Sequence, residues 1–199
     1  MKPVKLTAII FILAIAASGS AAYEMIWKQG DFTDSQKQKI ERSFKRIGKR
    51  TNQLLGQITV ELNLLKHPKY APLVRELNNL RFVLNKIKQG INSTAENLEL
   101  YQVALKKPDT LAQAVPGRWY LYAPQLLYNS TTSGRKWYEL REEDLDVLNF
   151  HELSHFYGTE DDDSKGELMN AATLQVLMYL DLKDHIVYDN LKRQVEKSK

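Results

Sequence analysis

The chain has no cysteine among its 199 residues. It can therefore have neither a disulfide framework nor a lipoprotein anchor, and it has no thiol nucleophile. A phosphate-binding glycine loop and the serine turn of many hydrolases are also missing from the sequence. Its stability must come from a hydrophobic core, helped by any bound metal. The 43% of hydrophobic residues are ample to form such a core.

The chain has only one long apolar run, and it lies at the start. Two lysines precede the stretch Leu6–Ala17, which is followed by small residues that end in Ser20-Ala21-Ala22. This stretch is shorter than the roughly 20 residues of a membrane-spanning helix. It predicts a secretory signal peptide over residues 1–22, with cleavage after Ala22. We therefore expect a secreted or periplasmic protein whose residues 23–199 form one domain, with no stable membrane insertion after cleavage.

Charge is distributed unevenly along the chain. Residues 28–90 carry 14 Lys/Arg against 5 Asp/Glu, whereas residues 91–199 carry 12 against 18. One interpretation is a basic surface that meets anionic lipid or cell-wall polymer, and the other is a solvated pair of helices. The basic residues are interleaved with an apolar period and form no cluster, which favours the second interpretation. We expect no nucleic-acid partner.

The front part, residues 33–107, is predicted to be helical. Over residues 34–65 apolar side chains recur three, four or seven positions apart, as in an amphipathic helix. Thr33 or Asp34 can cap such a helix. A second amphipathic helix is predicted over residues 70–90, ending at a glycine. Residues 94–107 are also read as helix, although some apolar positions there alternate as in a strand.

The rear part, residues 116–199, begins with a short predicted strand around Trp119–Tyr122. After a polar loop, three acidic residues begin a helix predicted over residues 142–156, since carboxylates favour the positive end of a helix. Two further helices are predicted over 167–180 and 183–197. The predicted fold class is therefore mainly α (α+β), with a short β element before the 142–156 helix.

This helix contains the only pattern that points to a specific chemistry, His151-Glu152-Leu153-Ser154-His155. Four residues are about one helical turn, so both imidazoles leave the same face and can bind one ion. Glu152 lies beside that face and can reach a metal-bound water without being a ligand. With 4 histidines in 199 residues, a shuffled chain would contain roughly 0.005 copies of the pattern.

A catalytic zinc needs a third protein ligand and an open position. In a continuing helix, Asp161 would lie about 9 Å beyond His155 at 1.5 Å per residue, too far to share an ion. Gly158 can end the helix and turn the chain back, since glycine adopts the left-handed conformation. Asp161, three residues past that turn, is then well placed to close the site.

The letters HELSHF followed by Gly158-Thr159-Glu160-Asp161 resemble the aspzincin family of zinc metallo-endopeptidases, which includes deuterolysin and the lysine-specific metallo-endopeptidases. The resemblance implies that His151, His155 and Asp161 bind Zn²⁺ and that Glu152 is the catalytic base. It also implies a zincin-like helical domain that hydrolyses a protein or peptide substrate. We expect this endopeptidase to be a monomer.

The sequence departs from the family beyond this motif. The family often continues GTxDxxYG, with a tyrosine that helps to stabilise the oxyanion. Here that position is Ser164, and the glycine comes late, at Gly166. Tyr157, Tyr179 and Tyr188 are the possible replacements.

Three alternatives remain open. The same letters read HExxHxxGxxD and resemble metzincin-like peptidases, in which Met169 would lie beneath the metal. His185 could replace Asp161 as the third ligand, although it is expected on an exposed helix. The other histidine outside the motif, His67, lies beside a proline and is more simply a helix-end residue than a metal ligand. In the third alternative the chain is a non-enzymatic exported binding protein with a structural metal.

Overall fold

The computed structural model describes residues 25–29, 31–92, 98–102, 112–115, 119–122, 136–157, 159, 168 and 176–198. Its α-helices are α1 (Asp34–Leu64), α2 (Ala71–Asn92), α3 (Glu142–Phe156) and α5 (Ile186–Lys197). Its strands are β1 (Met25–Gln29), β2 (Leu98–Gln102), β3 (Ala112–Val115) and β4 (Trp119–Tyr122). Short 3-10 turns span η1 (Pro68–Tyr70), η2 (Trp137–Glu139) and η3 (Leu182–Asp184). The expected class, mainly α with a small sheet, is confirmed.

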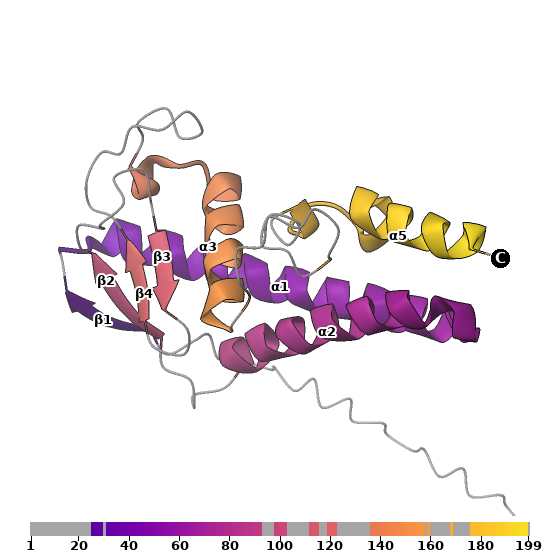
Figure 1. Cartoon of the computed structure of the whole chain (residues 1–199). Coiled ribbons are helices and arrows are strands. Elements are labelled where there is room, and N and C mark those ends of the chain that lie inside the picture. Colours follow the sequence, from indigo (N-terminus) through magenta and orange to yellow (C-terminus); the bar gives the residue numbers. More distant parts are fainter. Residues whose placement is uncertain are drawn as a thin grey trace, which may run out of the picture.

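α1 begins where the sequence predicts. The Thr33 hydroxyl accepts a hydrogen bond from the Gln36 amide, and the Gln36 side chain accepts one from the Thr33 amide in return. This capping box satisfies two amides that the first helical turn leaves without partners. The apolar stripe of α1 packs against that of α2, and the two helices lie side by side as a long pair (Figure 1). Their buried residues include Ile40, Phe44, Ile47, Leu54, Ile58, Leu73, Leu77, Leu80, Leu84 and Ile87.

The four strands form one sheet in the order β1-β2-β4-β3. β1 pairs with β2 and β2 with β4 in parallel, whereas β3 runs antiparallel to β4 at the edge of the sheet. α3 packs against β3 on one side and crosses α1 on another (Figure 1). The edge of the sheet and α1 therefore both contact α3.

One predicted element is wrong. Residues 94–107 were expected to extend the helical front part, but Leu98–Gln102 form the strand β2, whose neighbours are β1 and β4. Strand, the other possibility that the sequence left open here, is therefore correct for these five residues, and Leu100 is fully buried in it. The strands β1 and β3 were not predicted.

The helices predicted over 142–156 and 183–197 are confirmed, whereas in the helix predicted over 167–180 only residues 176 and 177 of the described ones are helical. α3 has the predicted bounds, and α5 occupies most of 183–197. Of the helix predicted over 167–180, only residue 168 and residues 176–180 are described. The signal peptide predicted over residues 1–22 lies outside the described residues. None of the described helices is long and apolar enough to cross a membrane.

Candidate metal centre

α3 carries the candidate site, and both of its ends follow from the sequence. Its first turn contains three acidic residues, which favour the positive end of the helix dipole. After its last turn the Thr159 amide donates to the Ser154 carbonyl at 3.1 Å, a bond that spans five positions. Such a bond is the signature of a helix end at which the chain folds back, often through a glycine. Gly158 has the corresponding sequence position and lies outside the described residues.

The two histidines of α3 meet on one face of the helix. Nε2 of His151 and Nε2 of His155 are 3.0 Å apart, with ring centroids separated by 4.5 Å and ring planes nearly perpendicular at 88°. Both side chains are only half-buried, so this face is accessible. Two nitrogen ligands on one tetrahedral zinc, with bonds near 2.0–2.1 Å, lie about 3.3 Å apart. The pair therefore fits a shared zinc ion with a movement of a few tenths of an ångström.

The backbone of Thr159 sets the proton position on His155. The Thr159 carbonyl oxygen lies 2.6 Å from Nδ1 of His155. A carbonyl only accepts, so Nδ1 carries the proton and the neutral ring keeps the lone pair of its Nε2 for another partner. A hydrogen bond from the second ring nitrogen to a carbonyl is the usual way in which metal-binding histidines are oriented. The turn after α3 thus fixes the orientation of the His155 ring.

The described residues offer the two histidines no third metal-binding side chain. Within those residues, no group of three His, Cys, Asp or Glu side chains comes together as a metal site. Asp161, the predicted third ligand, lies outside the described ranges, as do Ser164, Gly166, Glu167 and Met169. The assignment of Asp161 therefore stays a prediction.

Glu152 reaches the sheet. Its side chain is 7% exposed, and its Oε2 accepts a hydrogen bond from the Ala114 amide at 2.7 Å. Ala114 belongs to β3, which the sequence analysis did not predict. The nearest sequence signal was the Pro116-Gly117 break that follows this strand.

This hydrogen bond fixes which way β3 faces. Ala114 is opposite Tyr120 in β4, yet its amide donates to Glu152. In an antiparallel pair a residue turns its N–H and C=O to the same side, so both groups of Ala114 face the outer edge of the sheet. The side chains of Ala112 and Ala114 are buried, whereas Gln113 between them is exposed. The Glu152 carboxylate therefore lies at the outer edge of β3, the side on which the described strands include no further neighbour.

Two of the three replacement tyrosines are engaged elsewhere. The Tyr179 hydroxyl donates to the Glu143 carbonyl in the first turn of α3, eight positions or about 12 Å along the helix from His151. Tyr179 is 50% exposed, and the burial of its other half, aided by nearby carboxylates, raises the pKa of this tyrosine to about 12. Tyr188 is 2% exposed and donates to the Glu61 carboxylate; burial and this bond raise its pKa. Tyr157, directly after α3, is the nearest of the three in the chain.

The remaining histidines have capping roles. His185 was expected on an exposed helix, and this is wrong, because its side chain is 2% exposed. Its Nδ1 accepts from the Val187 amide at 3.3 Å and so caps α5. His67 caps η1 in the same way, accepting from the Lys69 amide at 3.2 Å, which confirms it as a helix-end residue.

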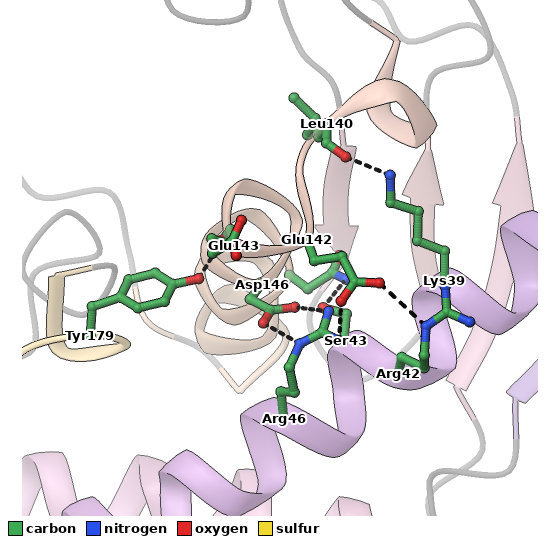
Figure 2. Close-up of polar contacts among 10 residues, drawn as sticks. Lys39, Arg42, Ser43, Arg46, Leu140, Glu142, Glu143, Asp146 and Tyr179 are labelled. Carbon is green, nitrogen blue, oxygen red and sulfur yellow. Dashed lines mark hydrogen bonds and ion pairs between the residues drawn. The ribbon is translucent and has the colours of Figure 1, made fainter.

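Basic residues of α1 hold the acidic start of α3. Arg46 binds Asp146 through two hydrogen bonds of 2.6 and 2.8 Å and also binds Glu142 at 2.8 Å (Figure 2). Arg42 lies 3.4 Å from the same Glu142 carboxylate. Lys39 donates to the carbonyl of Leu140 just before the helix. The basic front and acidic rear of the chain are thus partly matched to each other, through side chains of which Arg42 and Glu142 remain about half exposed.

Comparison with protein-family models, with curated proteins and with solved structures finds no match for this chain. What defines the site is therefore its own geometry. The described residues form a mainly α protein with a pair of convergent histidines, a buried carboxylate beside them and a free strand edge in contact with that carboxylate.

Proposed function

We propose that this chain is a zinc-dependent endopeptidase, exported by a cleaved signal peptide, in which His151, His155 and Asp161 hold the metal and Glu152 is the catalytic base. The observation that carries the proposal is the convergence of the two Nε2 atoms to 3.0 Å on the face next to Glu152. The carbonyl bond to Nδ1 of His155 supports it, because it leaves the nitrogen needed for a metal free of its proton.

Glu152 is suited to move a proton. Zinc bound by the pair would polarise the peptide carbonyl and acidify the attacking water. Glu152 takes the proton from that water and passes it to the departing amine, as a general base and then a general acid. Its bond to the Ala114 amide orients the carboxylate toward the edge of the sheet.

The edge strand supports a peptide as the substrate. An extended peptide can add to a strand edge through main-chain hydrogen bonds, and among the described strands β3 has a neighbour, β4, on one side only. A substrate in this position has its main chain beside Glu152. Neither a nucleic acid nor a folded ligand offers the matching row of amides and carbonyls.

The competing reading is an exported protein that binds anionic polymers and keeps a merely structural metal. The contacts of α1 weigh against it, because Lys39, Arg46 and Arg50 are engaged by carbonyls and carboxylates of the same chain. The aspzincin and metzincin-like readings assign the same ligands and the same base, so the proposal does not depend on a choice between them.

The test combines metal analysis with digestion of a peptide library by the purified chain without its signal peptide. The wild type should carry about one zinc per chain and cleave the library. Glu152→Gln should keep the zinc and lose about 10²- to 10⁴-fold in kcat. Glu143→Gln, an exposed position on the same helix, is the matched control and should be fully active.

The outcomes separate the readings. Undiminished proteolysis by Glu152→Gln rejects the mechanism. A wild type that binds zinc but cleaves nothing in the library supports the structural-metal reading. A wild type that binds no zinc rejects both.

A further inference from the structure

Two polar contacts join α1 and α3 where these helices cross. Arg46 grips Asp146 with a two-pronged bond of 2.6 and 2.8 Å, and the Asn149 amide donates to the Ser43 hydroxyl at 2.9 Å. Three of the four side chains are almost completely shielded from water: Ser43 and Asn149 are 0% exposed and Asp146 is 3% exposed. Figure 2 shows Arg46 reaching up from α1 between Asp146 and Glu142.

Stability alone does not account for these contacts. Moving an ion pair out of water is unfavourable, and apolar residues of similar volume at such sites are often as stable or more so. Apolar packing is available here, since Phe44, Ile47 and Leu153 are buried in the same core. What directed hydrogen bonds add to apolar packing is orientation, because the fork of an arginine fits a carboxylate in one geometry.

These contacts hold the side of α3 that lies opposite the histidines. Asp146 and His155 are nine positions apart, which is two and a half turns at 3.6 residues per turn. Asn149 and His151 are two positions apart, or about 200° around the helix axis. Glu152 lies between the two sides and meets β3. The rotation of α3 about its axis therefore decides whether Glu152 reaches Ala114 and where the histidines point.

We propose that Arg46 is a positioning residue for the metal site, and that its fork on Asp146, together with the Ser43–Asn149 bond, fixes the rotation of α3. This inference rests on the proposed peptidase function. Arg46 touches neither histidine in the described contacts; it acts through the helix.

The test is the double variant Arg46→Met/Asp146→Leu, which removes both charges and leaves none buried alone. It should fold with a circular dichroism spectrum and a Tm close to those of the wild type, because the Asp146 carboxylate is buried and the Arg46 side chain is only 34% exposed, and apolar residues often replace such pairs without loss of stability. Its kcat should fall about 10- to 100-fold with little change in KM, because misplacement of about 1 Å has effects of this size. Its zinc affinity should fall about 10-fold.

Two single variants test whether geometry or charge matters. Arg46→Lys keeps the charge but cannot form the two-pronged bond. Its kcat should lie between that of the double variant and that of the wild type. Arg42→Gln is the matched control on the same face of α1. Its partner Glu142 is 47% exposed, and the pair is 3.4 Å apart, so activity and zinc affinity should not change.

A folded double variant with the kcat and zinc affinity of the wild type overturns the inference while the peptidase proposal stands. Full activity of Arg46→Lys also overturns it, because charge alone would then suffice. A wild type without zinc and without cleavage is a failure of the proposed function itself, and the two failures are therefore distinguishable.

Discussion

The amide of Ala114 and the carboxylate of Glu152, 38 positions apart in the chain, are joined by a hydrogen bond of 2.7 Å. This bond connects the edge strand β3 to the helix that carries both histidines. It orients a buried carboxylate at the edge of the sheet. The histidine pair, the proposed catalytic base and the edge strand are thus related through a single contact.

Ala114→Pro tests that contact with little change elsewhere. Proline has no amide hydrogen, and at an edge strand an outward-facing amide is the position at which it is tolerated. Loss of a hydrogen bond to a charged group, worth about 1.5–3 kcal/mol, should lower kcat about 10- to 100-fold while zinc content stays unchanged. Steady-state kinetics and metal analysis are the measurements.

Ala112→Pro is the matched control, because Ala112 faces the same way two positions earlier in β3. It should leave kcat within about two-fold of the wild type, as its amide does not contact Glu152 in the described structure. If the two proline variants lose activity equally, the effect is one of strand stability and the role given to Ala114 is wrong.

The sequence predicts α3 well and the sheet poorly, and the reason is physical. The bounds of α3 depend on local signals, namely the acidic residues of its first turn and the glycine two positions after Phe156. A strand such as β2 depends on partners far away in the chain, since it pairs with residues near 26 and near 120. Local periodicity carries no information about such pairing, so 94–107 was read as helix.

The same difference applies to the candidate site. The pairing of His151 with His155 follows from helix geometry alone, so one turn of sequence sufficed to predict it. The partner of Glu152 could not be predicted, because Ala114 contributes a backbone amide from a strand that local pattern did not indicate. The link between Arg46 and Asp146 was equally hidden, since interleaved charges on a helix usually face water.

Arg50 is expected to matter for stability. It is 9% exposed, and its guanidinium donates to the carbonyls of Leu177, at 2.9 Å, and Leu180. Arg50→Ala leaves these carbonyls without that donor and removes a buried aliphatic stem, so it should lower the free energy of unfolding by about 2–3 kcal/mol. Urea denaturation measures this. Arg75→Ala, whose side chain is 75% exposed, should change it by less than about 0.5 kcal/mol.

Tyr179 should make stability depend on alkaline pH. Its pKa is about 12 in the folded chain against 10.0 for a free phenol, mainly because of burial. Between these two values the folded state keeps a proton that the unfolded state has lost, so stability declines as pH rises from about 10 to about 12. Tyr179→Phe should lose less stability than the wild type from pH 9 to pH 11.5 in urea titrations. Parallel losses in the two proteins would contradict this.

Asp161 is the remaining test of the metal site. Thr159 is held beside His155 by its carbonyl and beside Ser154 by its amide, so the chain after α3 has turned back toward the histidines. Asp161 follows two positions later, and two residues span at most about 7 Å, which brings a carboxylate there within reach of the pair. His185 is a poor substitute, because it is buried and caps α5.

Reach alone does not separate Asp161 from its acidic neighbours, since Glu160, Asp162 and Asp163 lie in the same stretch of chain. The resemblance to aspzincins does separate them, because it makes the last residue of the GTxD pattern, Asp161, the proposed ligand. Asp161→Ala should weaken zinc binding more than about 100-fold, beyond the 10- to 100-fold typical of residues that only orient a ligand. Asp163→Ala should bind zinc as the wild type does. Chelator competition measures both, and the reverse ranking of the two variants would move the third ligand away from Asp161.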